Sequence, residues 1–228
     1  MGTNQTLKHR SEVEDAILSL KGLGLQPHPS SWEKNWDLAK AVGFITSNVE
    51  REAPILDAGA RWSPVLERLE KLGYSSLLAC DIKRSWRDSL RRMRTRSRVR
   101  FAVADLTATP YERSSFGAVT CLSVIEHGID PQAYVSEMSR IIRPGGFLIT
   151  STDYWCSPIH TDGIFPYGPQ FGEMRVFGPR DIEALVEVAL DHNFELTERL
   201  DLGCDQPVVY WRRVDRRFTF TFFVLRRT

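Results

Sequence analysis

Short apolar runs alternate regularly with longer, partly polar segments through the middle of the chain. Each apolar run has the length of a buried strand, and each segment between two runs is long enough for a helix. This alternation is typical of a parallel sheet with helices on both faces. The expected strands are 54–58, 76–80, 99–104, 116–123 and 146–152, and the expected helices are 63–72, 84–95 and 131–142.

Two helices are expected before this region. Residues 11–21 carry an apolar face, and Ser11 and Glu14 have the spacing of a capping box. A second helix begins near residue 31 and places Trp32 and Trp36 one turn apart. These tryptophans either pack on the edge of the sheet or lie on a helix that covers a ligand site.

The C-terminal part adds one helix and two strands. Pro179 stands at a favourable first helical position after Gly178. The closing strands are expected near 194–201 and 217–226, and the second of them alternates phenylalanine with threonine. The sequence therefore predicts an N-terminal helical cap over residues 1–50 and a main α/β domain over residues 51–228.

A glycine turn follows the first strand of the alternating region. Asp57 and Gly59 stand at its end, and Asp81 ends the next strand. Glycine lets the backbone turn sharply and approach a ligand closely. An acid about twenty residues further on is placed to accept hydrogen bonds from ribose hydroxyls. Because two carboxylates repel a pyrophosphate, the pair favours a cationic nucleoside.

Further motifs add a resemblance to a known family. Asp105 follows the third strand, Ile125-Glu126-His127 closes the fourth, and Arg143-Pro144-Gly145-Gly146 precedes the fifth. With the first turn and Asp81, this set resembles the class I S-adenosylmethionine-dependent methyltransferases, in their broad small-molecule branch, from about residue 55 to 152. The resemblance implies a doubly wound, Rossmann-like sheet of seven mostly parallel strands with an antiparallel C-terminal strand. It also implies S-adenosyl-L-methionine as cofactor, with contacts from Asp57, Ala58, Gly59, Ala60, Arg61, Asp81, Ile82, Asp105, Leu106, Ser123 and Val124.

The first turn departs from the family pattern. The family usually has three glycines at alternate positions, which fall here on Gly59, Arg61 and Ser63. Only the first is kept, and Arg61 is bulky where the methionine end of the cofactor would pass. Either the loop takes another path or the cofactor binds less tightly, and a non-catalytic cofactor-binding module is one reading of this change.

Several residues are candidates for proton transfer. His127 has a pKa range suited to a general base, although a packed histidine is an equal reading. His160 is the rival base, and Asp153 is a third catalytic candidate. Glu126 is expected to face the substrate. Asp153, His160 and Asp162 match no metal-binding motif, so no metal is predicted.

Residues 153–177 have no periodicity but many aromatic and proline residues. A loop of this length in a compact domain is usually functional. It is therefore expected to be a lid over the methyl acceptor, with polar contacts from Tyr154, His160 and Tyr167. The alternative is a structural flap that completes the core or a dimer interface.

Two arginine-rich segments raise the question of nucleic acid. Residues 83–100 hold nine basic residues against Asp88, and Arg212, Arg213, Arg216 and Arg217 form a second cluster. Such runs are usually solvated faces, but they also suit a phosphate-bearing substrate such as RNA. The aromatic residues typical of single-strand binding are missing around the arginines except for Trp86, so nucleic acid is not the expected partner.

Length, charge and cysteine content bear on the number of domains, the binding partners and the cellular compartment. A chain of 228 residues with 42% hydrophobic content builds one good core, and a net charge of +1 gives no general attraction to nucleic acid or membrane. No apolar stretch is long enough for a membrane span. The four cysteines are widely spaced, which predicts free thiols, a reducing compartment and a cytoplasmic location. The expected function is methylation of a small molecule, with an oxygen of a sugar or natural product preferred. RNA methylation through residues 83–100 is the alternative, and a homodimer is one option for assembly.

Overall fold

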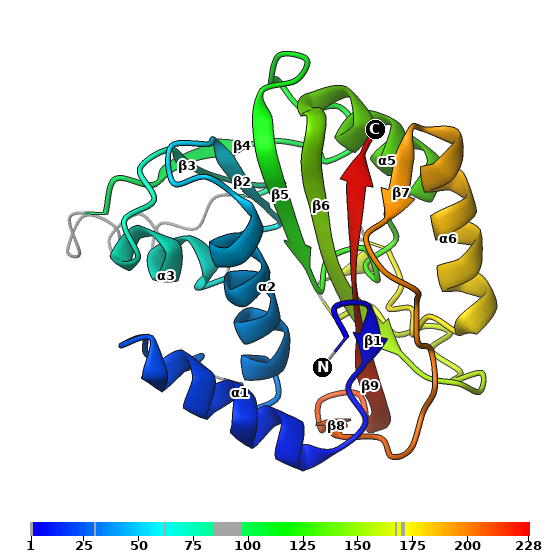
Figure 1. Ribbon diagram of the computed structural model, residues 1–228. Coiled ribbons are helices and arrows are strands. Elements are labelled where there is room, and N and C mark those ends of the chain that lie inside the picture. Colours follow the sequence, from blue (N-terminus) through cyan, green and yellow to red (C-terminus); the bar gives the residue numbers. More distant parts are fainter. Residues whose placement is uncertain (1, 30, 62, 84–96, 167, 170–171) are drawn as a thin grey trace.

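The protein is built around one mixed sheet. The structure, a computed structural model, describes residues 2–29, 31–61, 63–83, 97–166, 168–169 and 172–228. These residues form nine strands, in the spatial order β1-β9-β6-β5-β2-β3-β4, with β7 and β8 also paired to β9. Figure 1 shows β5, β6 and β9 side by side at the centre of the molecule, with helices to either side of them.

The parallel half of the sheet contains five strands. They are β2 (Ile55–Ala58), β3 (Leu77–Asp81), β4 (Arg100–Val103), β5 (Phe116–Leu122) and β6 (Ile142–Tyr154). All four pairings among these strands are parallel. Their carboxyl ends therefore meet at one edge of the sheet, where ligands bind in folds of this kind. The prediction of a doubly wound parallel sheet is confirmed.

The Arg-Pro-Gly-Gly segment lies within β6, whereas the sequence predicted a turn before a strand at 146–152. The register explains the difference. Phe116 pairs with Ile142 and Ala118 with Phe147, so the segment between Ile142 and Phe147 forms an irregularity in the ladder. Gly145 has a φ of +79°, which glycine adopts without strain. The strand thus begins before the motif and resumes after it.

The antiparallel half is organised by β9 (Arg216–Arg227). This strand pairs with β6, with β1 (Gln5–Thr6), with β7 (Phe194–Leu196) and with β8 (Val209–Trp211). The expected alternation of phenylalanine and threonine is present, although both kinds of side chain are buried because both faces of β9 are covered. The predicted antiparallel C-terminal strand is confirmed, whereas β1 and β8 have no counterpart in the sequence prediction.

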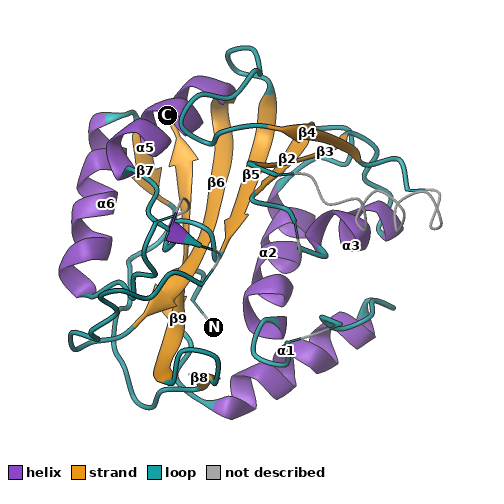
Figure 2. Ribbon diagram, turned by 180° about the vertical axis from the view of Figure 1, so that it is seen from behind, coloured by secondary structure: helices purple, strands orange, loops and turns teal. Residues whose placement is uncertain are grey.

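Helices cover the two faces of the sheet. On one face lie α1 (Arg10–Gly22), α2 (Asn35–Asn48) and α3 (Val65–Lys71), whose apolar residues share a core with Phe220 and Phe222. On the other lie α5 (Pro131–Ile141) and α6 (Pro179–Asp191), packed with Phe223 and Leu225. Figure 2 shows these two groups on opposite sides of the strands. The predicted helix over 84–95 lies outside the described residues.

The N-terminal helices differ in detail from the prediction. The amino end of α1 is held by Glu12, whose carboxylate accepts hydrogen bonds from the N–H groups of Lys8 and His9 at 2.8 and 2.9 Å. The predicted pair of Ser11 and Glu14 is therefore wrong by two residues. Trp36 is buried and meets Phe222 edge to face, with ring centroids 6.2 Å apart. Of the two roles considered for Trp36, packing against the sheet is therefore the one observed.

A disulfide joins Cys156 to Cys204, whereas Cys80 and Cys121 are free and buried. The prediction of free thiols is therefore wrong for the first pair. Spacing along the chain did not suggest the bond because 48 residues separate the two cysteines. Disulfides persist mainly in oxidising compartments. The cytoplasmic location loses this support and stays a prediction.

The disulfide predicts a measurable stabilisation. A crosslink that closes a loop of this size restricts the unfolded chain and contributes about 3–4 kcal/mol. The double variant Cys156→Ser/Cys204→Ser should lower the free energy of unfolding by that amount in urea titration. The matched control is Ser157→Ala, an exposed position next to Cys156 that leaves the crosslink intact. Coincident unfolding midpoints for oxidised and fully reduced wild-type protein would contradict the prediction.

Candidate active site

The loop after β2 is shaped by one close contact. Gly59 has a φ of +77°, and the N–H groups of Gly59 and Ala60 both donate to the carbonyl of Cys80, at 2.9 and 3.0 Å. A Cβ atom on Gly59 would lie 2.3 Å from a methyl carbon of Val124. Glycine is therefore required here both for its dihedral angle and for the approach of the loop after β5.

Next to this contact lies a cavity of about 390 Å³, which we call the cofactor cavity. Its volume lies in the range of small-molecule sites. Eight of the predicted cofactor residues line it: Gly59, Arg61, Asp81, Ile82, Asp105, Leu106, Ser123 and Val124. Asp57, Ala58 and Ala60 are buried and do not line it. Asp57 instead accepts a hydrogen bond from the Thr120 hydroxyl at 2.7 Å, which joins β2 to β5 below the loop.

The two acids of the cofactor cavity are held by backbone groups. Asp81 accepts hydrogen bonds from the N–H groups of Arg61 at 3.2 Å and Lys83 at 3.1 Å. Burial raises the pKa of Asp81 above its usual value, and these bonds oppose the shift. Asp105 accepts from the N–H and hydroxyl of Thr107 at 2.9 and 2.7 Å, which lowers its pKa. Both carboxylates are thus fixed at the cavity wall.

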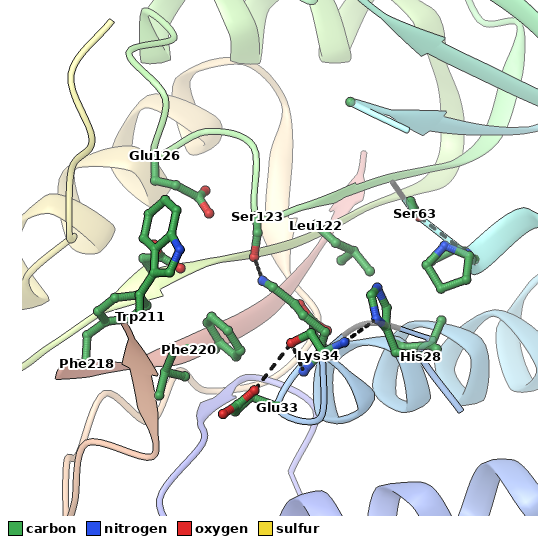
Figure 3. Close-up of a pocket in the computed structure, with 18 of the residues that line it drawn as sticks. His28, Glu33, Lys34, Ser63, Leu122, Ser123, Glu126, Trp211, Phe218 and Phe220 are labelled. Atoms are coloured by element: carbon green, nitrogen blue, oxygen red, sulfur yellow. Dashed lines mark hydrogen bonds and ion pairs between the residues drawn. The ribbon is translucent and has the colours of Figure 1, made fainter. Parts of the chain in front are cut away.

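A second cavity of about 470 Å³ adjoins the first, and we call it the acceptor cavity. Gly59, Ser123 and His127 line both cavities, so the two meet at these residues. The wall of the acceptor cavity comes from the start of α2, the loops after β2 and β5, the end of β6, and β8 and β9 (Figure 3). A group donated from one cavity can therefore reach a molecule in the other.

Lys34 crosses the acceptor cavity. Its ammonium donates a short hydrogen bond to the Ser123 hydroxyl, lies 3.5 Å from a carboxylate oxygen of Asp37 and stands 3.8 Å from the ring centroid of Phe220. Figure 3 shows the side chain reaching from the residue just before α2 toward Ser123. Burial lowers its pKa, but attraction to Asp37, Asp153 and Glu126 outweighs this and raises the pKa overall. Lys34 is therefore a cation at neutral pH.

The backbone of Ser123 is in an unusual conformation at the junction of the cavities. Its φ of +53° is uncommon for a residue with a side chain. The N–H of Ser123 donates to the carbonyl of Ser151 at 2.9 Å, and its hydroxyl accepts from Lys34. Such conformations persist where neighbouring groups enforce them, and they gather at functional sites.

The structure brings only part of the predicted catalytic set together. His127 lines both cavities, and Asp153 and Glu126 line the acceptor cavity. His160 is exposed and lines neither; its backbone carbonyl accepts a hydrogen bond from Arg216 at 2.8 Å. The residues that could act on a bound acceptor are therefore those of β5, β6 and the loop after β5.

The predicted lid contributes little to the described walls. Tyr154 is fully buried, and its hydroxyl donates to the carbonyl of Leu202 at 2.7 Å, so it faces the core. Tyr167 lies outside the described residues. Of the described residues in 153–177, only Asp153 and Gly172 line either of these two cavities. The acceptor lid therefore stays a prediction.

The remaining predictions concern metal, nucleic acid and membrane. Among the described residues, no group of three or more His, Cys, Asp or Glu side chains is arranged to hold a metal ion. Most of the arginine-rich segment 83–100 falls outside the described part of the chain. Within the described part, no helix is long and apolar enough to cross a membrane.

The sequence analysis missed much of the acceptor cavity. Lys34 and Asp37 were not singled out, because one lysine and one aspartate on a helix carry no motif. Trp211, Phe218 and Phe220 line the cavity from β8 and β9. The one available signal was the second reading of the helix after residue 31, that it covers a ligand site; the start of α2 does line this cavity.

Comparison with known families finds one matching family model. Residues 56–150, which are less than half of the chain, match the model described as "Methyltransferase domain". The match confirms the predicted resemblance to the class I S-adenosylmethionine-dependent methyltransferases.

A search of curated proteins finds relatives over a short part of the chain. A ubiquinone biosynthesis O-methyltransferase from Xanthomonas oryzae pv. oryzae is 43% identical over 51 residues, which are 22% of this chain and 20% of that enzyme. The chain thus matches about a fifth of the length of that curated relative.

Solved structures share the fold over most of the chain. The [4+2]-cyclase SpnF has a TM-score of 0.66 at 14% identity, covering 95% of this chain and 93% of that one. The 1,6-didemethyltoxoflavin-N1-methyltransferase of Burkholderia thailandensis, solved with its substrate and S-adenosylhomocysteine, has a TM-score of 0.60 at 16% identity, covering 96% and 88%. These likenesses show the fold, and the substrate must be inferred from the cavity.

The contact between Gly59 and Val124 predicts a specific mutational pattern. Gly59→Ala should lower the free energy of unfolding by at least about 2 kcal/mol, because the positive φ and the crowded Cβ both penalise alanine. Adding Val124→Ala should recover part of the loss by removing the two nearest methyl groups. Urea titration of both variants and of Val124→Ala alone measures the coupling. Strictly additive effects would contradict the contact.

Asp81 predicts a loss of cofactor affinity. Replacing it by Ala removes hydrogen bonds from ribose hydroxyls to a carboxylate, each worth roughly 1.5–3 kcal/mol. Affinity for S-adenosylhomocysteine should fall at least about tenfold in calorimetry. The control is Asp191→Ala, an exposed acid at the end of α6. An unchanged affinity in Asp81→Ala would remove the ribose assignment.

Proposed function

We propose that the protein transfers the methyl group of S-adenosylmethionine to a small molecule held in the acceptor cavity. The observation that carries this proposal is the junction of two cavities at Gly59, Ser123 and His127. Bound in the first cavity, the cofactor would supply an electrophilic methyl group. Alignment of donor and acceptor accounts for much of the rate in such a transfer.

The residues of the cofactor cavity fit this nucleoside. Asp81 would accept hydrogen bonds from the ribose hydroxyls, with Ile82 beside the adenine and Asp105 and Leu106 at its far edge. The two carboxylates also favour a ligand with positive charge. Arg61 lines the same cavity in place of a family glycine, so it is expected to reshape the methionine end of the site.

His127 is the preferred group for proton removal. It lines both cavities, so its ring is near the place where an acceptor atom would meet the methyl group. A positioned base contributes about 10²–10⁴-fold when the acceptor is a weak acid. The preference for an oxygen of a sugar or natural product is kept from the sequence analysis. Glu126 and Asp153 would contact the acceptor itself.

The proposal is tested by binding first and turnover second. In calorimetry, S-adenosylmethionine and S-adenosylhomocysteine should bind, and NAD should not. Formation of S-adenosylhomocysteine is then measured with pools of hydroxylated aromatics, sugars, small amines and RNA. Turnover should appear in a small-molecule pool and fall by about 10²-fold or more in His127→Gln. Calorimetry of the same variant with S-adenosylhomocysteine separates a loss of turnover from a loss of cofactor affinity.

Three results would count against the proposal. A failure to bind S-adenosylhomocysteine removes the cofactor assignment. Turnover confined to RNA, with a rate that falls steeply as salt is raised, would favour the arginine-rich segment and a polyanionic substrate. Binding without turnover in any pool would favour a non-catalytic cofactor-binding module.

A further inference from the structure

Acidic side chains outnumber basic ones in the acceptor cavity. Asp37, Glu126 and Asp153 all lie in its wall, and each is at least nine-tenths buried. Lys34 is the only lysine or arginine in the wall among the residues that the structure describes. Buried carboxylates without matching cations are costly. The cavity therefore has fewer basic than acidic side chains, and a ligand with a positive charge would offset the difference.

Lys34 already forms an ion pair with Asp37, one of these three acids. Its ammonium lies 3.5 Å from Asp37 and donates to the Ser123 hydroxyl. Asp37 is completed by a hydrogen bond from the Ser151 hydroxyl at 2.8 Å. This set is satisfied from within the chain. Among the buried acids of the wall, Glu126 and Asp153 are therefore left without a contacting cation, whereas Glu33, a fourth acid of the wall, is only half-buried.

Asp153 is the clearest case. Its residue is 5% exposed, it lines the cavity, and its carboxylate has no hydrogen-bond or ion-pair partner among the described residues. Burial and repulsion from Glu126 raise its pKa well above the usual range, although Lys34 opposes the shift. Glu126 is 1% exposed and accepts one hydrogen bond, from the Thr152 hydroxyl at 3.0 Å. Each group has acceptor capacity left for a ligand.

The aromatic wall is suited to the same kind of ligand. Trp211, Phe218 and Phe220 line the same cavity as Glu126 and Asp153. Aromatic faces attract cations, most strongly where water is excluded. The chain itself provides an example, since the ammonium of Lys34 stands 3.8 Å from the Phe220 centroid. Trp211 and Phe218 offer further aromatic surface.

From the two acids and this wall we infer that the methyl acceptor carries a protonated amine, bound by Glu126 and Asp153 against Trp211 and Phe218. This inference rests on the proposed function for the identity of the reaction, and it adds the class of substrate. A cavity of about 470 Å³ leaves room for an apolar body attached to the amine. The inference concerns recognition, because a protonated nitrogen has no lone pair for the methyl group. The methyl group would therefore go to another atom of the acceptor, or to this nitrogen after it has lost a proton to a base such as His127.

The test compares three probes of the same shape and different charge. 2-Phenylethylamine, 2-phenylethanol and phenylacetate are titrated into the full chain by calorimetry, with and without saturating S-adenosylhomocysteine. The amine should bind at least about tenfold more tightly than the alcohol, and the carboxylate should not bind detectably, because a buried charge needs its counter-ion. Methylation of the probes is not required.

Two variants assign the effect to the named acids. Glu126→Gln and Asp153→Asn should each weaken amine binding at least about tenfold and leave the affinity for S-adenosylhomocysteine unchanged. The matched control is Glu112→Gln, an exposed acid outside both cavities that should change neither affinity. Circular dichroism melting checks that each variant is folded.

The outcomes separate the inference from the proposed function. If the amine binds no better than the alcohol, or if both acid variants keep full amine affinity, the inference is overturned even when S-adenosylhomocysteine binds normally. If the amine preference is present but S-adenosylhomocysteine fails to bind, the charge assignment stands and the methyltransferase proposal fails.

Discussion

The approach of Gly59 to Val124 is the contact on which the site depends. It brings the loop after β2 against the loop after β5, with no room for even a Cβ atom between them. Because of this approach, the cofactor cavity and the acceptor cavity share a wall and meet at the same residues. The parallel register of β2 and β5 places the loops correctly in the first place.

Electrostatic balance distinguishes the two cavities. In the cofactor cavity, Asp81 and Asp105 are held by backbone N–H groups, so their charge is partly satisfied before any ligand binds. In the acceptor cavity, Lys34 forms an ion pair with Asp37, and no cation contacts the buried carboxyl groups of Glu126 and Asp153. Acidic residues in the two cavities therefore differ in whether their carboxyl groups are already hydrogen-bonded to backbone N–H groups of the chain.

Local patterns were enough to predict the parallel sheet and the acidic ends of its strands. Asp81 and Asp105 could be placed because each directly follows an apolar run that can only be a strand. Lys34, Trp211 and Phe218 could not, since they reach the site from segments before and after the alternating region, and only packing brings those segments together. The disulfide escaped prediction for the same reason. The prediction that Tyr154 contacts the acceptor failed because an aromatic residue next to a site can equally pack in the core. Tyr154 does so, and its hydroxyl donates to the carbonyl of Leu202.

The place of β9 in the chain has a consequence for synthesis. This strand comes after all the others, yet β1, β6, β7 and β8 each form their hydrogen-bonded ladder on it. During translation the amino-terminal part emerges first, so these four strands must wait on the ribosome with an unpaired edge. A nascent chain can assemble the parallel half of the sheet, with the strands that carry Asp57 and Asp81, early. The half that contributes Trp211, Phe218 and Phe220 to the second cavity forms only when residues 216–227 leave the exit tunnel.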